Sequence, residues 1–379
     1  MLSSRLLFRF LCLAAYFVCF LHSFQWAKLP VSRDSRVRLE WGAQVVGGPD
    51  WTTSETCSAT PRAWLESLPD GVYTVIRCDL SPTGEWSVWG SDFHLNRLAE
   101  GYQRQKLPSP EAAISHTEKA LNDTRIVLAT LLDNAAKELP FLLDWTAGPS
   151  SCCSCVVVVM ATILWTTSDI DSGIRVRGHL YSSSARVTDT ALLSDPIKTV
   201  IALSFDARKP LPDRRSSDDP RIKSSSWCRR RRPLEEQFKN SDSSIGEVIL
   251  SNQDGPVTTL LEGLTTNLCF VYPHHILRMC THEVLDGYAQ SLVRECAPEL
   301  GYTISTAPVS IAESLLWQEV FVTSSVRIVT PVESVALPNK GETTTCNRII
   351  WRRSNSNHPV ASSIYAHIIR NKARWGKNF

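Results

Sequence analysis

The chain has 379 residues, a length that predicts about two domains and excludes a single small core. Hydrophobic residues make up 43% and charged residues 21%, which is ordinary for a globular protein that buries a core. Forty basic and thirty-eight acidic side chains almost cancel. No overall positive field therefore favours nucleic acid as a partner.

The first thirty residues differ from the rest of the chain. Arg5 and Arg9 precede an apolar run from Phe10 to Leu21, and no acidic residue occurs before Asp34. A run of about twelve residues matches a signal-peptide core and is short for a membrane span. Residues 1–30 are therefore predicted to be a targeting segment or weak membrane anchor. The alternatives are an endoplasmic-reticulum signal, a plastid or mitochondrial presequence, a two-part plastid signal, or a start codon placed upstream of a cytoplasmic enzyme.

The polar segment 31–60 is interpreted as a linker, followed by a small α/β domain over 61–190. Alternation and β-branched residues predict strands in this first domain, and apolar residues at helical spacing predict one long helix. The expected elements are a strand at 71–78, a strand entering a helix over 85–102, a helix at 110–139, and strands at 156–165 and 174–180. The polar stretch 182–196 is the predicted domain junction.

The larger second domain is predicted over 191–379. Its expected elements are a strand at 199–205, a polar loop at 208–220, a helix at 227–238, a β-hairpin within 247–271, helices at 283–300 and 311–317, a strand at 320–323, and a helix at 360–374. In the hairpin, Glu262 and Gly263 precede Thr265, Thr266 and Asn267 at the start of an apolar strand. A solvated turn glutamate beside strand-forming threonines is the simpler interpretation.

The segment LEGLTTN at 261–267 resembles the Glu-Gly-x-x-Ser/Thr-Asn signature of fold-type IV pyridoxal-phosphate enzymes. This class IV family includes branched-chain aminotransferases, D-amino acid aminotransferases and aminodeoxychorismate lyases. Three further segments resemble the family in the same order, namely FHLNRL at 93–98, PRIKSSSW at 220–227 and EVFVTSSVRIVTPV at 319–332. The resemblance covers about residues 70–370. It implies a two-domain α/β (α+β) enzyme, usually a homodimer, with pyridoxal 5'-phosphate (PLP) between the domains.

The resemblance assigns a role to Lys223 in IKSSSW. A lysine amine holds PLP as a Schiff base and then moves the substrate α-proton. Relatives often carry Asn three or four positions after this lysine, where the present chain has Ser226 and Trp227. Glu262 is the implied partner of the pyridine nitrogen, where a carboxylate keeps the ring protonated.

The resemblance also implies the residues that bind the phosphate. Arg97 matches the family's phosphate arginine, with His94 and Leu98 packed around it. Gly287 and Tyr288 begin a predicted helix, whose backbone amides favour a phosphate. Relatives commonly have threonine at the position of Ala289, so hydroxyls elsewhere are expected to replace it. The implied replacements are Thr265, Thr266, Ser324 and Ser325.

Two other clusters receive structural interpretations. The run Arg229–Arg232 lacks interleaved aromatic residues for stacking bases, so a solvated face is favoured over nucleic-acid binding.

Twelve cysteines are scattered without the spacing of a disulfide framework. Cys152, Cys153 and Cys155 have no further ligands at metal spacing, so buried structural thiols are expected and no metal site is predicted.

The predicted activity is PLP-dependent transamination between an amino acid and a 2-keto acid through Lys223. Because one fold hosts several reactions, an aminodeoxychorismate lyase-type β-elimination that releases pyruvate is an alternative. A catalytically silent relative that keeps the fold as a binding or structural protein is a third hypothesis.

Overall fold

A computed structural model gives the arrangement of most of the chain. It describes residues 42–46, 55–56, 60–81, 83–105, 110–142, 156–167, 174–187, 195–202, 219–254, 257–338, 348–354 and 358–378. The predicted targeting segment 1–30 and the cysteines at 152–155 lie outside the described residues. Of the helices that are described, none is both long and apolar enough to cross a membrane.

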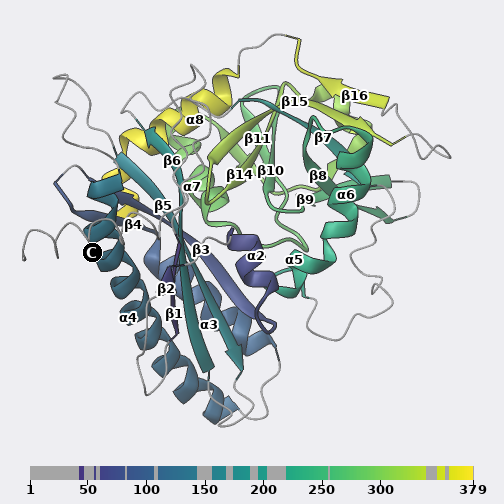
Figure 1. The fold of residues 1–379 in the computed structure, drawn as a ribbon. Helices are drawn as coiled ribbons and strands as arrows, with labels where there is room; N and C mark the ends of the chain where they lie inside the picture. Colours follow the sequence, from purple (N-terminus) through teal and green to yellow (C-terminus); the bar gives the residue numbers. More distant parts are fainter. Residues whose placement is uncertain are drawn as a thin grey trace, which may run out of the picture. The chain divides into compact units, whose positions relative to one another are not determined.

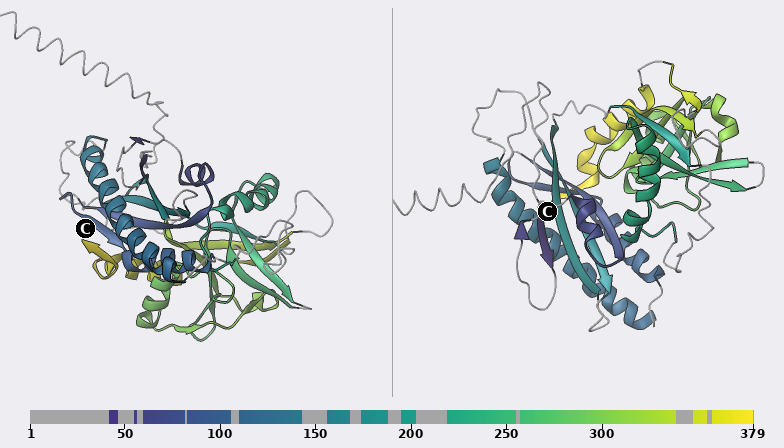
Figure 2. Two further views of the ribbon diagram at one scale, coloured as in Figure 1. Left: turned by 90° about the horizontal axis from the view of Figure 1, so that it is seen from below. Right: turned by 45° about the vertical axis from the view of Figure 1, so that its right-hand side comes forward.

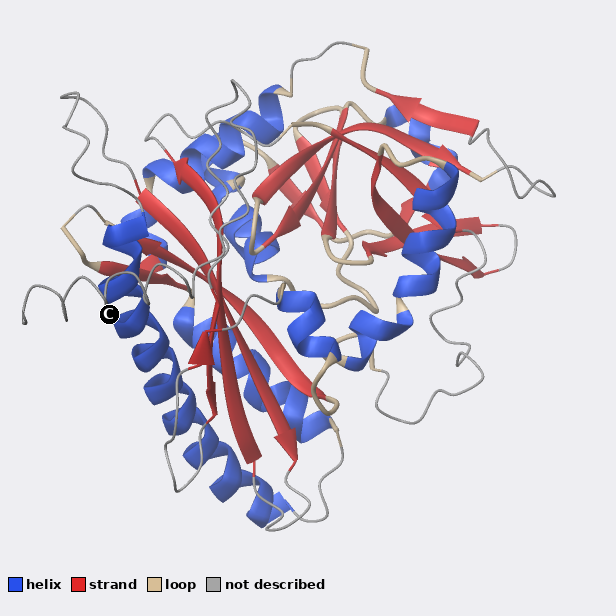
Figure 3. Cartoon of the chain, viewed as in Figure 1, coloured by secondary structure: helices blue, strands red, loops and turns tan. Residues whose placement is uncertain are grey.

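The first half of the chain forms a seven-stranded antiparallel sheet, in the order β17-β4-β3-β5-β6-β1-β2. Its strands are β1 (Gly42–Val46), β2 (Glu55–Thr56), β3 (Gly71–Leu80), β4 (Trp86–Trp89), β5 (Val156–Thr167), β6 (Ile174–Val187) and, from the C-terminal end, β17 (Gly376–Asn378). Helices α2 (Pro61–Glu66), α3 (Ser91–Arg104) and α4 (Pro110–Leu142) accompany it. Figures 2 and 3 show α4 running along this sheet, where its buried face joins the same core as β3 and β5.

The second half forms a ten-stranded mixed sheet (Figure 1). The order is β12-β11-β10-β14-β15-β7-β8-β9-β13, with β16 paired to β15. The strands are β7 (Ile197–Ala202), β8 (Ile245–Asp254), β9 (Val257–Gly263), β10 (Asn267–Tyr272), β11 (Ile276–Met279), β12 (Thr303–Ser305), β13 (Val309–Ser310), β14 (Glu319–Ser324), β15 (Ile328–Leu337) and β16 (Arg348–Arg352). Parallel pairing joins β7 to both β8 and β15.

Helices and short 3-10 turns accompany this second half of the chain. They are α5 (Ser226–Arg230), α6 (Arg232–Ser241), α7 (Tyr288–Cys296), η1 (Pro298–Leu300), η2 (Ile311–Leu316), α8 (Pro359–Arg370) and α9 (Lys372–Trp375). Of these, α6, α7, α8 and η2 pack against the second sheet. Buried Glu319 accepts hydrogen bonds from the backbone amides of Val360 (3.2 Å) and Ala361 (2.8 Å), which satisfies two free donors at the start of α8. The mixed α/β class expected from the sequence is confirmed.

Several predicted elements have different bounds in the structure, and three of these differences bear on the site. The expected hairpin is made by β8 and β9 alone, because the chain turns after Gly263 and β10 pairs instead with β11 and β14. The helix expected at 227–238 is divided into α5 and α6, since Pro233 lacks a backbone donor and sits in the first turn of α6. The helix expected from residue 283 begins only at Tyr288.

The segment expected to be a linker also differs. Strand β1 within it pairs with β6 over five residues and so belongs to the seven-stranded sheet. The domain boundary near residue 190 stays a prediction.

The segment that carries Lys223 is tied to the first sheet by backbone hydrogen bonds. The amide of Tyr73 on β3 donates to the carbonyl of Lys223 (2.9 Å), and the amide of Ser225 donates to the carbonyl of Gly71 (2.9 Å). The Ser225 hydroxyl accepts a further bond from the Gly71 amide (3.0 Å). Although about 150 residues separate them in the chain, the two segments are held in fixed register.

Candidate functional site

A cavity of about 410 Å³ collects residues from both halves of the chain. This volume lies within the range of small-molecule and cofactor sites. All nine residues that the sequence analysis assigned to the site line this cavity: Arg97, Lys223, Glu262, Thr265, Thr266, Gly287, Tyr288, Ser324 and Ser325. His94 is buried beside Arg97 and Leu98 is buried in the core, but neither lines the cavity.

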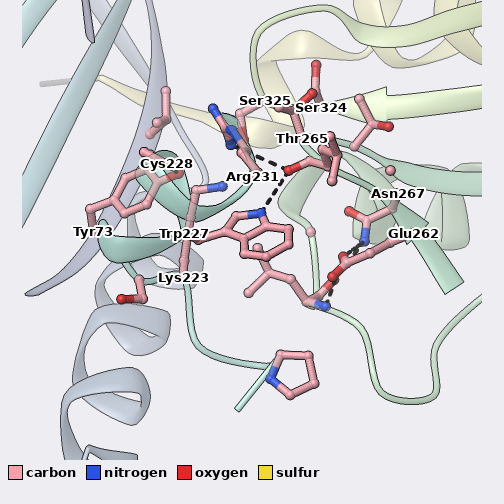
Figure 4. Close-up of a pocket in the computed structure, with 18 of the residues that line it drawn as sticks. Tyr73, Lys223, Trp227, Cys228, Arg231, Glu262, Thr265, Asn267, Ser324 and Ser325 are labelled. Carbon is pink, nitrogen blue, oxygen red and sulfur yellow. Dashed lines mark hydrogen bonds between the residues drawn. The ribbon is translucent and has the colours of Figure 1, made fainter. Parts of the chain in front are cut away.

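Lys223 contributes a primary amine to the cavity (Figure 4). Its Nζ lies 5.0 Å from the centre of the Tyr73 ring. Burial, followed by the positive charges of Arg97 and Arg231, lowers the pKa of Lys223 to about 7. A large fraction of this amine is therefore unprotonated near neutral pH, the form that can act as a nucleophile or a base.

Glu262 contributes a buried carboxylate from the last residues of strand β9. Its Oε2 accepts hydrogen bonds from the backbone amide of Leu285 (3.1 Å) and the side-chain amide of Asn267 (3.5 Å). Burial raises the pKa of Glu262 to about 8, although the Leu285 bond and the charge of Lys223 act in the other direction. Such a carboxylate gains from a cationic partner, because the partner favours its ionised form.

Arg97 places a second charged group at the cavity from helix α3. One guanidinium nitrogen, Nη2, donates to Thr74 Oγ1 at 2.6 Å, and Nη1 donates to the carbonyl of Asp286 at 3.3 Å. Burial lowers the pKa of Arg97 to about 10, which still leaves it charged at neutral pH. The carboxylates of the described residues form no ion pair with it, so its charge is available to an anion.

A close contact between Gly90 and Tyr288 positions the start of helix α3. Gly90 caps the helix with φ 58°, and a Cβ there would lie 2.1 Å from the ring of Tyr288. Only glycine combines this left-handed conformation with so close an approach. Arg97 and Tyr288 are thereby brought to one cavity from elements far apart in the chain.

The turn between β9 and β10 supplies hydroxyls. The Gly263 amide donates to the Thr266 carbonyl (2.8 Å), which closes the turn, and Thr265 Oγ1 donates to buried Glu247 (2.6 Å). Among the described residues, Thr266 Oγ1, Thr323 Oγ1 and Arg97 Nε are buried without a hydrogen-bond partner. Buried polar atoms normally have partners. Unsatisfied donors around a cationic cavity fit a bound group rich in acceptor oxygens, as a phosphate is.

The sequence analysis missed several residues of the cavity. Tyr73, Trp227 and Arg231 line it, and the Trp227 indole donates to the carbonyl of Leu264 (3.0 Å). Tyr73 gave no signal because it is one of many strand aromatics. Trp227 could have been found, since it closes the IKSSSW segment.

The arginine run was expected to form one solvated face, and the structure shows that this expectation is wrong. Arg229 and Arg232 do point outward and form ion pairs with Asp70 and Glu66. Arg230 and Arg231 instead line the cavity, and the side chain of Arg231 is 12% exposed. The break between α5 and α6 falls at this residue, so successive side chains cannot share one surface.

Comparisons with known proteins agree with this geometry. Residues 206–335 match the family model described as amino-transferase class IV. No curated protein matches the chain.

Solved structures share the fold. The fold IV-transaminase CpuTA1 from Curtobacterium pusillum is 15% identical, with a TM-score of 0.59 over 88% of this chain and 99% of that one. A branched-chain amino acid aminotransferase from Thermobaculum terrenum in its PLP form is 15% identical, with a TM-score of 0.56 over 89% and 97%. A hypothetical aminotransferase from Mycobacterium tuberculosis in its PLP-bound form is 16% identical, with a TM-score of 0.55 over 88% and 100%.

The fold is thus that of fold-type IV aminotransferases. Within that fold, residues 206–335 are similar to the class IV aminotransferase family, as the sequence resemblance predicted. The family depends on PLP.

Proposed function

We propose that this protein is a PLP-dependent aminotransferase that moves an amino group between an amino acid and a 2-keto acid. The observation that carries the proposal is the meeting of Lys223, Glu262 and Arg97 in one cavity. The amine has a lowered pKa, the carboxylate is buried, and the guanidinium forms no ion pair with a described carboxylate. These groups suit the aldehyde, the pyridine nitrogen and the phosphate of PLP. The match of residues 206–335 to the class IV aminotransferase model supports the same conclusion.

The residues present fit the cofactor. Arg97, with the hydroxyls of Thr266 and Ser325, would hold the phosphate, and Glu262 would hold the pyridine nitrogen. The unsatisfied polar atoms Arg97 Nε and Thr266 Oγ1 support this assignment. When bound, PLP supplies an electron sink for the pair left at the substrate α-carbon.

Lys223 carries the proton in this proposal. Because its pKa is lowered to about 7, Nζ can accept the α-proton of an amino acid and return it, as an efficient general base does when its pKa lies near the working pH. The Leu285 amide and Asn267 keep the Glu262 carboxylate in place while the charge in the site changes. The homodimer and the role of residues 1–30 stay predictions.

Replacement of Lys223 tests the proposal. The purified chain should acquire a visible absorbance band with PLP, and borohydride should fix the cofactor to Lys223 in a peptide map. Lys223→Ala should lose the band and all transamination while keeping the wild-type melting temperature. Lys198→Ala is the matched control, because Lys198 bonds to Ser244 and does not line the cavity.

The reaction type needs a second measurement. A transaminase given an amino donor without a keto acid should lose the band and release one keto acid per site. A spectrum unchanged by a panel of L- and D-amino acids, with pyruvate released from aminodeoxychorismate, would favour the lyase. No band at any PLP concentration would support a silent relative.

A further inference from the structure

A cluster of charged side chains joins α2 to α5 and α6 along one side of the cavity. Four guanidiniums and three carboxylates form its ion pairs: Arg62, Arg229, Arg231 and Arg232 with Glu66, Asp70 and Glu235. Glu235 is shared between Arg62 and Arg231, and Glu66 between Arg62 and Arg232. The cluster therefore holds one more positive than negative charge.

Among the four guanidiniums of the cluster, Arg231 is the one whose charge acts most strongly on its surroundings. Its side chain is 12% exposed, against 33% for Arg62, 40% for Arg229 and 51% for Arg232. Water screens the three more exposed guanidiniums, whereas a less exposed one exerts a stronger field on its surroundings. Arg62, Arg230 and Arg231 line the cavity, and Arg229 and Arg232 do not. Arg62 is paired with both Glu66 and Glu235, and Arg230 donates to the Ser226 hydroxyl (3.2 Å).

The contacts of Arg231 use two of its three guanidinium nitrogens, Nε and Nη1. Nε lies 3.1 Å from Glu235 Oε1, and Nη1 donates a long hydrogen bond of 3.4 Å to the carbonyl of Leu264. In the part of the chain that the structure describes, no hydrogen bond uses Nη2. Leu264 lies two residues after Glu262, so the open nitrogen is close to the turn that lines the cavity.

Two guanidiniums act on Lys223 from different elements, Arg97 from α3 and Arg231 from the α5–α6 junction. The cofactor has one phosphate, for which Arg97 is the proposed partner. Since Arg97 is assigned to that phosphate, the second cation near the reacting amine can serve another anion. An amino acid substrate brings a carboxylate, which a guanidinium binds with charge-assisted hydrogen bonds.

We infer that Arg231 binds the carboxylate of the substrate, held in place by Glu235 and the Leu264 carbonyl. The inference rests on the proposed function and deepens it, because it names the residue that selects substrates with a carboxylate over amines without one. Arg231 is then a specificity-determining residue supplied by the helix pair that follows Lys223.

The direct test measures carboxylate binding without turnover. 4-Methylpentanoate has a carboxylate and no amine, and its dissociation constant can be measured by calorimetry on the full chain, loaded with PLP if PLP binds. Arg231→Met should weaken binding by roughly ten- to a hundred-fold, the value of a lost charged hydrogen bond. Arg231→Lys should recover part of the loss. Arg232→Met is the matched control and should bind like the wild type.

A kinetic comparison tests the claimed selectivity. Leucine and 3-methylbutylamine differ only in the carboxylate, so Arg231→Met should raise KM for the active leucine enantiomer by a similar factor and leave the amine unchanged. Melting temperatures check that both Arg231 variants are folded.

Several results would overturn the inference. They are wild-type carboxylate affinity in folded Arg231→Met, loss of PLP affinity in place of carboxylate affinity, and a wild-type chain that binds no carboxylate. Failure of the proposed function has another signature, namely absence of the PLP band, and the calorimetric test of Arg231 does not depend on that band.

Discussion

Gly287 lies so close to Asn267 that a Cβ on the glycine would be 1.9 Å from Asn267 Oδ1. The backbone of Gly287 is ordinary, with φ −89°, so the requirement for glycine here is one of space. Asn267 Nδ2 in turn donates to the carbonyl of Leu285 (2.7 Å) and contacts Glu262 (3.5 Å). Because Gly287 has no side chain, the Asn267 amide has room to lie where it contacts and positions Glu262, the carboxylate of the site.

Gly287→Ala is expected to push Asn267 out of place. Overpacking of this kind costs about 1–3 kcal/mol of unfolding free energy, and loss of the Glu262 contact should weaken PLP binding as well. Chemical denaturation and a PLP titration measure the two effects.

A double-mutant cycle supplies the control for this prediction. Because Asn267→Ala removes the atom that clashes, adding Gly287→Ala to it should cost less than about 0.5 kcal/mol more. Fully additive costs would show that the two residues are independent, contrary to the prediction.

Arg97→Ala should weaken PLP binding by roughly ten- to a hundred-fold, because charged hydrogen bonds contribute on the order of 1.5 to 3 kcal/mol. Arg97→Lys keeps the charge but not the planar fork, so it should recover only part of the affinity. A fluorescence titration with PLP measures both variants. Unchanged affinity in Arg97→Ala would remove this residue from the phosphate site.

The titration of Lys223 gives a prediction with a definite sign. Its charged or titratable neighbours are Arg97 from α3, Arg231 from the α5–α6 junction, Cys228 from α5 and Glu262 from β9, while the Tyr73 ring packs against it. A nearby cation disfavours the protonated amine and lowers its pKa. Arg231→Met should therefore raise the pKa of Lys223 from about 7 toward the ordinary lysine value.

Reductive methylation of the PLP-free protein with ¹³C-formaldehyde, followed by NMR at a series of pH values, measures this pKa. Lys223 should be the lysine with the lowest value, and Arg232→Met should leave it unchanged. A downward shift in Arg231→Met would contradict the assignment of Arg231 to the field around Lys223.

The sequence by itself determined the order of the motifs and nine of the residues that line the cavity. LEGLTTN and IKSSSW are local patterns, and the strand and helix periods around them follow from side-chain alternation. Such information is contained in neighbouring residues, so it can be read without knowing what lies across the fold.

Tertiary structure decided which arginines of Arg229–Arg232 line the cavity, namely Arg230 and Arg231. Arg229 and Arg232 pair with Asp70 and Glu66, residues about 160 positions earlier, and no local pattern reports such partners. The pKa of Lys223 is likewise lowered by burial and by Arg97, a residue of another helix. Desolvation and charge depend on what surrounds a group in space, so only the folded chain defines them.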